Sequence, residues 1–81
     1  MKKVKIHVTQ EDIDNGLKGN GRSCPIVLAY KRAGYNPKWV GAYNVNFNDI
    51  KIPISVRAIK FITRFDRGHI VKPITFILPV E

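Results

Sequence analysis

Cysteine is almost absent from this sequence, because Cys24 is the one cysteine among 81 residues. A single cysteine cannot form an internal disulfide, which is typical of proteins from reducing compartments and excludes a disulfide-stapled secreted scaffold. Long apolar runs are missing as well, and none approaches the ~20 residues of a membrane span. Nor does the start at Met1-Lys2-Lys3 lead into the apolar core of a signal peptide. We therefore expect a cytoplasmic protein without a membrane partner.

Acidic residues are scarce. Six Asp or Glu stand against fourteen Lys or Arg, which gives a formal net charge of +8. Three of the acids, at positions 11, 12 and 14, fall at a predicted helix start, where capping explains them. No pair of carboxylates remains for general acid and base catalysis. One cysteine and two histidines cannot complete a four-ligand zinc site. The sequence therefore predicts a non-enzyme that needs no cofactor or metal, with an anionic partner.

The chain is short, and its composition sets limits on the fold. A chain of 81 residues predicts a single domain over residues 1–81, which buries only about 60% of its unfolded surface. Hydrophobic residues make up 44% of the sequence, more than a disordered basic tail contains. We expect a folded domain with little room for an enclosed enzyme pocket.

Periodicity and capping signals predict an alternation of strands and helices. Thr9 and Asp12 have the form of a capping box for a short helix, and Asn15-Gly16 supplies a left-handed stop. Pro25 begins a mostly apolar helix, which Ser23 or Cys24 could cap. The expected strands cover residues 3–9, 39–47, 50–52 and 70–80, and the two main helices cover residues 25–33 and 53–65.

This order predicts an α+β fold with a three- to four-stranded sheet and two main helices on one face. Helices on one face would leave the other face of the sheet partly open. Because 81 residues can hardly cover that face, we expect a homo-oligomer.

The last predicted helix carries a stripe of cations. Arg57, Lys60, Arg64 and Arg67 follow at spacings of three, four and three residues. At about 100° per residue they fall within an arc of roughly 80°. The alternative interpretation is an ordinary solvated face. A helix built only for stability would mix charge signs to gain i,i+4 pairs, so the lack of matching acids favours a binding face.

A glycine-rich loop over residues 16–23 feeds the N-terminus of the helix that begins at Pro25. Lys18, Arg22 and Ser23 lie in it, in a pattern close to a phosphate-binding loop. Glycines let backbone N–H groups converge on an anion. A true loop of that class follows a strand directly, whereas a helix start intervenes here. The alternative is a flexible loop whose glycines satisfy turn geometry.

Two further groups allow a functional and a structural interpretation. Cys24 beside Arg22 at a helix N-terminus could be a thiolate with His7 as its base, although inert packing is the commoner role of a lone cysteine. Trp39 could stack on nucleic-acid bases together with the aromatic residues at 43 and 47, although such a stripe is more often the core face of a strand.

Three segments resemble small uncharacterised accessory proteins of bacteriophages and prophages. They are Val-Thr-Gln-Glu-Asp-Ile-Asp-Asn-Gly at residues 8–16, Ser-Cys-Pro-Ile-Val-Leu-Ala at residues 23–29, and the Phe-Asp-Arg-Gly at residues 65–68 that follows Phe61-Ile62. The resemblance implies a phage protein that acts in the cytoplasm of a bacterial host. It supplies no catalytic or binding residues.

Together these features predict a non-enzymatic binding protein. It would capture an anionic nucleotide, such as an immune signalling nucleotide, or a nucleic acid, and thereby counter host defence. The alternative is a protein inhibitor that docks its basic surface on an acidic host protein such as a defence nuclease complex. The expected ligand-binding residues are Arg57, Lys60, Arg64, Arg67, Lys18, Arg22 and Ser23.

Overall fold

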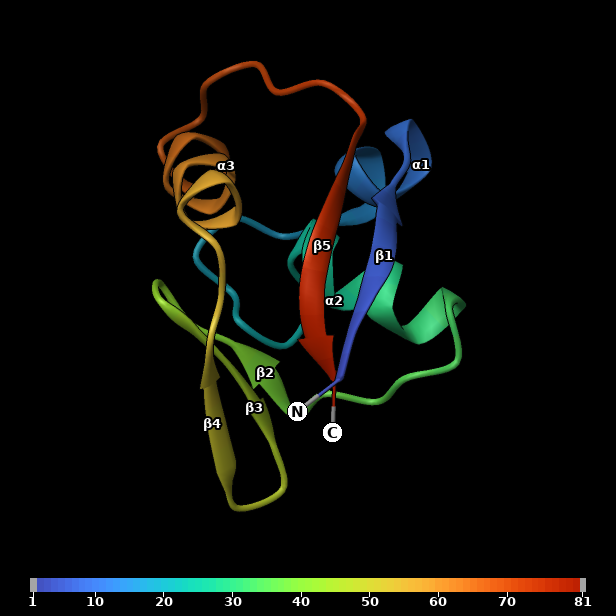
Figure 1. Ribbon diagram of the computed structural model, residues 1–81. Coiled ribbons are helices and arrows are strands. Elements are labelled where there is room, and N and C mark those ends of the chain that lie inside the picture. Colours follow the sequence, from blue (N-terminus) through green and yellow to red (C-terminus); the bar gives the residue numbers. More distant parts are fainter. Residues whose placement is uncertain (1, 81) are drawn as a thin grey trace.

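The computed structural model describes residues 2–80, which form three helices and five strands around one hydrophobic core (Figure 1). In chain order these are β1 (Lys2–Val8), α1 (Gln10–Asn15), α2 (Pro25–Arg32), β2 (Trp39–Val40), β3 (Asn44–Phe47), β4 (Ile50–Pro53), α3 (Val56–Asp66) and β5 (Ile74–Val80). The predicted α+β class is confirmed. Within residues 2–80, each helix is too short or too polar to cross a bilayer.

The first and last described strands pair with each other along their full length. β1 and β5 are antiparallel, in a register that runs from Lys2 opposite Val80 to Val8 opposite Ile74. Ile6 and Val8 of β1 are buried, and the residues that alternate with them are exposed, as period-two patterning requires. This confirms the first predicted strand and most of the last, which begins at Ile74 rather than at residue 70. We call this pair the β1–β5 ribbon.

The other three strands form a separate antiparallel sheet in the order β2-β3-β4. Residues 2–80 thus contain the predicted three-stranded sheet, but β1 and β5 form a second sheet of their own instead of joining it. The predicted placement of both main helices on one face of a sheet is not confirmed. α2 lies behind the ribbon, and α3 lies to one side of it (Figure 1).

The predicted strand over residues 39–47 folds back on itself and forms two strands, β2 and β3, of the same sheet. Trp39 pairs with Asn46, and the Gly41 N–H donates to the Asn44 carbonyl at 2.8 Å across the turn. A Cβ at Gly41 would lie 2.6 Å from the Trp39 ring, so any larger residue at this turn requires the ring to shift. The hairpin continues into β4, which confirms the short strand predicted there.

Helix α1 begins with the predicted capping box. The Asp12 N–H donates to Thr9 Oγ1 at 3.3 Å, and the Thr9 N–H donates to Asp12 Oδ2 at 2.9 Å. The predicted left-handed stop was wrong, because Gly16 has a φ of −71°. Glycine is required there by packing, since a Cβ would lie 2.7 Å from the Pro25 side chain.

Helix α2 runs through the core, as predicted, with Ile26, Val27 and Tyr30 fully buried. The Tyr30 hydroxyl donates to the Pro79 carbonyl at 2.7 Å and so ties the helix to β5. Cys24 is the N-cap residue, without a side-chain capping hydrogen bond. The helix is thus held by burial rather than by its cap.

Candidate basic groove

A groove of about 350 Å³ lies between α3 and the segment that leads into β5. We call it the basic groove. Its lining consists of four cations and five apolar residues: Arg57, Lys60, Phe61, Arg64, Ile70, Val71, Lys72, Pro73 and Ile74. Most of its exposed lining surface is apolar.

Helix α3 positions one wall of the groove. Its N-cap is Ser55, whose hydroxyl accepts from the Ala58 N–H at 3.3 Å, so the helix begins at Val56 rather than at residue 53. The buried face of α3 consists of Ala58, Phe61, Ile62 and Phe65. Because this face packs on the core at helical spacing, Arg57, Lys60 and Arg64 are turned outward together.

The floor of the groove is fixed by aromatic packing. The ring of Phe61 meets that of Phe76 edge to face, with centroids 5.6 Å apart and planes at 77°. The Arg57 guanidinium carbon lies 5.9 Å from the centroid of the same Phe76 ring. One wall cation is therefore anchored to the core by its planar head as well as by its helix.

The electrostatics of the basic groove are one-sided, because no carboxylate belongs to its lining. Asp66, the one acid in α3, accepts from the Gly19 N–H at 2.9 Å instead. Within residues 2–80 the one ion pair joins Asp12 to Arg32, on other elements. The four groove cations thus concentrate positive potential beside an apolar floor, where electrostatic interactions are stronger than in bulk water.

The structure brings together three of the four stripe residues predicted from the sequence. Arg57, Lys60 and Arg64 line the groove, whereas Arg67 is the exposed C-cap residue of α3 and lies outside the lining. Sequence reasoning missed Lys72, which reaches the groove because the chain reverses after Gly68, at a φ of +82°. The Lys72-Pro73 pair just before the last apolar run was the available signal.

The glycine-rich loop lies outside the basic groove, since Lys18, Arg22 and Ser23 are not among the groove lining. The backbone N–H groups that we expected to face a phosphate make internal contacts. Gly19 donates to the Asp66 carboxylate, and the Ser23 N–H donates to the Asn20 carbonyl at 3.2 Å. The Arg22 N–H donates to Asn20 Oδ1 at 2.9 Å. One N–H group of the loop therefore binds a carboxylate of the same chain, and two others bond within the loop.

A second, smaller cavity of about 260 Å³ includes Cys24 and Trp39 in its lining. Burial raises the pKa of the Cys24 thiol, outweighing the backbone N–H groups of α2, which lower it. The predicted thiolate is thus disfavoured. His7, its suggested base, instead shares a 2.7 Å hydrogen bond with Thr75 across the ribbon. Within residues 2–80, no three His, Cys, Asp or Glu side chains converge as metal ligands.

The predicted aromatic stripe is not one surface. Phe47 is buried, whereas Tyr43 is 67% exposed. The centroid of the Trp39 ring lies 5.9 Å from Lys51 Nζ. Because the turn at Gly41 separates Trp39 from the other two residues, the stripe does not form a single stacking platform.

Comparisons of the chain with protein-family models, with curated proteins and with solved structures found no match. The resemblance to phage accessory proteins stays a prediction.

Proposed function

We propose that the protein is a non-enzymatic binding protein that captures a nucleotide in the basic groove. The observation that carries this proposal is the convergence of Arg57, Lys60, Arg64 and Lys72 around an apolar floor that contains no carboxylate. A nucleotide combines an apolar planar base with a multiply charged phosphate chain. The floor would take the base, and the four cations would pair with the phosphates.

The dimensions of the groove support a small ligand. Its volume of about 350 Å³ lies at the lower end of the range of small-molecule sites, roughly 300–1,000 Å³. The charged groups of the lining are lysines and arginines, which bind phosphates but supply no nucleophile or general base at neutral pH. The groove is thus suited to hold its ligand, and the proposal includes no chemical step.

Calorimetric titration with ADP tests the proposal, with adenosine and inorganic pyrophosphate as the two halves of the ligand. We expect one ADP per chain and much weaker binding of either half. The Arg57→Gln/Arg64→Gln variant should bind ADP at least about tenfold more weakly, since each charge-assisted contact contributes about 1.5–3 kcal/mol. The matched control is Lys31→Gln/Lys38→Gln, which removes the same charge from exposed positions outside the groove.

The titration distinguishes groove binding from attraction by net charge. Equal losses in the groove variant and its control would contradict the proposal, as would pyrophosphate that binds as tightly as ADP. A protein that binds none of the three probes would also overturn it.

A second candidate function is the docking of an acidic protein segment in the same groove. Ile70, which is 87% exposed, favours it, because this side chain extends the apolar lining formed by Val71, Pro73 and Ile74 to the surface. This candidate predicts that ADP does not bind and that Ile70→Ser abolishes capture of an acidic, leucine-containing peptide. Nucleotide capture predicts the opposite pair of results.

A further inference from the structure

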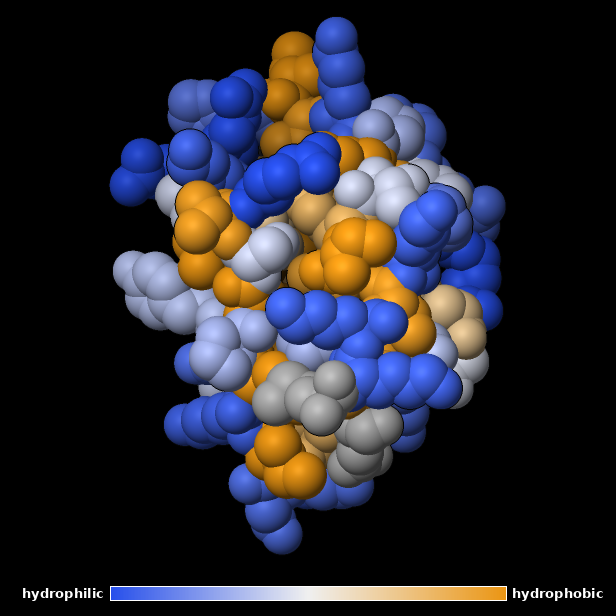
Figure 2. Space-filling model, viewed as in Figure 1, coloured by the Kyte–Doolittle hydropathy of each residue, from blue (hydrophilic) through white to orange (hydrophobic). Residues whose placement is uncertain are grey.

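The outward face of the β1–β5 ribbon is a second basic surface, separate from the basic groove. Lys3, Lys5 and His7 of β1 are exposed on it, together with Thr75 and Ile77 of β5. β1 and β5 lie at the front of the molecule in Figure 1. Figure 2, which has the same view, shows long hydrophilic side chains across this face. None of the groove-lining residues belongs to β1.

The ribbon holds these side chains at regular intervals. Alternate residues of a strand lie about 6.8 Å apart, so Lys3, Lys5 and His7 form an evenly spaced row. The opposite face is buried through Ile6 and Phe76, which are 0% and 1% exposed. The strand that carries Lys3, Lys5 and His7 therefore packs directly on the hydrophobic core.

Two observations define how the outward side chains pair across the ribbon. The Arg32 guanidinium donates to the His7 carbonyl, and the Tyr30 hydroxyl donates to the Pro79 carbonyl. Pro79 also has no N–H that could donate to β1. Both carbonyls thus bond to side chains of α2. Because these carbonyls point away from the opposite strand, the pairs Lys3–Pro79, Lys5–Ile77 and His7–Thr75 are the non-hydrogen-bonded pairs of the ribbon. Side chains approach each other most closely in such pairs. The 2.7 Å contact between His7 and Thr75 is one such pair, and Lys5 opposite Ile77 is the next.

Among the residues that the structure describes, the two strands of the ribbon carry no acid. Within residues 2–80 the one ion pair lies between α1 and α2. A second copy of the chain added along β1 would set its own lysines against these, which is unfavourable. Charge complementarity therefore favours a polyanion as the occupant of this face.

We propose that the outward face of the β1–β5 ribbon binds double-stranded DNA in the major groove. That groove is about 12 Å wide and admits a two-stranded ribbon. The side chains displayed are of the kinds that contact base edges: lysine reads the guanine O6 and N7 acceptors, threonine reads either donors or acceptors, and an apolar side chain meets the thymine methyl group. The inference is independent of the proposed nucleotide site, because the lysines involved lie outside the basic groove.

The test is fluorescence anisotropy with a short mixed-sequence duplex. The Lys3→Gln/Lys5→Gln variant should bind about tenfold or more weakly than the unsubstituted protein, and the slope of log affinity against log salt should decrease. The matched control is again Lys31→Gln/Lys38→Gln, which carries the same net charge from positions off the ribbon. Thermal unfolding of both variants verifies that they fold.

Protection of guanine N7 from dimethyl sulfate reports on the major groove directly. We expect protection by the unsubstituted protein and by the Arg57→Gln/Arg64→Gln variant, and none by the ribbon variant. The inference is overturned if the duplex does not bind, if the ribbon variant and its control weaken alike, or if single-stranded DNA of the same length competes as well as duplex. Loss of N7 protection in the Arg57→Gln/Arg64→Gln variant would also overturn it, by assigning DNA to the basic groove.

Discussion

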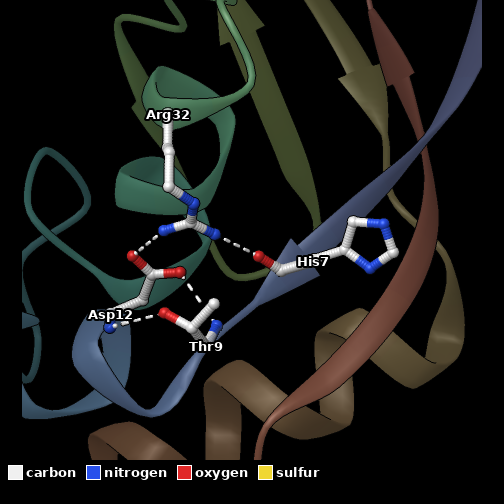
Figure 3. Close-up of polar contacts among 4 residues, drawn as sticks. All are labelled: His7, Thr9, Asp12 and Arg32. Carbon is white, nitrogen blue, oxygen red and sulfur yellow. Dashed lines mark hydrogen bonds and ion pairs between the residues drawn. The ribbon is translucent and has the colours of Figure 1, made fainter.

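At the scale of single residues, Asp12 has the most consequential environment (Figure 3). Its side chain is 6% exposed and pairs with Arg32 at 2.5 Å. Burial alone would raise the pKa of Asp12, but hydrogen bonds from Arg32 and Thr9, together with the Arg32 charge, hold that pKa below its ordinary value. Arg32 also donates to the His7 carbonyl, so one guanidinium joins α1, α2 and β1.

We predict that Asp12→Asn lowers the free energy of unfolding by about 1–3 kcal/mol at neutral pH, because it breaks a largely buried charge-assisted contact. The lowered pKa means that the carboxylate stabilises the fold above the unfolded value of 3.8, and that this contribution is lost as the pH falls through the lower folded value. Denaturant titrations at neutral and acidic pH should therefore show a smaller acid loss in the variant than in the unsubstituted protein.

Asp14→Asn is the matched control for this prediction, because it removes the same charge from an exposed position of α1. Asp14 accepts from Gln10 at 2.9 Å on the surface, where such contacts contribute little. Equal destabilisation by the two substitutions would show that the charge, rather than the buried pairing, is responsible.

At the scale of elements, the loop between α1 and α2 is held by tight packing and by its contact with α3. Gly16 packs against Pro25, the first residue of α2, and the Gly19 N–H donates a hydrogen bond to Asp66, the last residue of α3. These contacts join the loop to two helices. These contacts favour the alternative interpretation of the loop, in which its glycines meet the needs of turns and close packing.

We predict that Gly16→Ala destabilises the protein by about 1–3 kcal/mol, the usual cost of overpacking. The added Cβ would lie 2.7 Å from Pro25 Cδ and 2.9 Å from the Asp12 carbonyl oxygen. With a φ of −71°, Gly16 has no backbone conformation that alanine would avoid, so the cost comes from packing alone. Thermal unfolding should show a clear decrease in Tm, whereas Asn15→Ala at the exposed neighbouring position should leave Tm nearly unchanged.

Local signals predicted most elements correctly. The alternation in β1 and the capping box at Thr9 depend on residues within a few positions of each other, and both are confirmed. The hairpin at Gly41 was missed because apolar and polar residues keep alternating through the turn. The chain reverses there in a turn closed by the Gly41 N–H and the Asn44 carbonyl, and the alternation of residue types does not indicate this backbone contact.

The same distinction applies to the candidate site. Three groove cations follow from helical spacing along α3, which the sequence displays directly. Lys72 joins them only through the path of the chain after α3, and the Gly19–Asp66 contact spans 47 positions. Contacts of this kind depend on how elements pack, so no local pattern predicted them.

At the scale of the whole molecule, positive charge dominates. The sequence has a net charge of +8, and within residues 2–80 the structure has one ion pair, between Asp12 and Arg32. Like charges on a compact molecule of this size repel each other and destabilise the folded state. Self-association through an open face stays a prediction, and this repulsion works against it.

We predict that added sodium chloride raises Tm, because screening shortens the Debye length to about 8 Å at physiological ionic strength. A gain of about 0.5 kcal/mol corresponds to roughly 2–4 °C for a chain of this length. Scanning calorimetry over a salt series measures the shift. A Lys31→Glu/Lys38→Glu variant, with a net charge lowered by about four, should respond less to salt. A Tm that falls with salt would contradict the prediction.

The β1–β5 ribbon also constrains the order of folding. β1 is the first described element, and its partner is the last, so β1 has no strand to pair with until β5 has been synthesised. The β2-β3-β4 meander closes through short turns and can form earlier. Since closing a long loop costs entropy before any pairing repays it, the ribbon completes the fold. A chain in which β5 has not yet been synthesised therefore lacks the paired outward face of the ribbon.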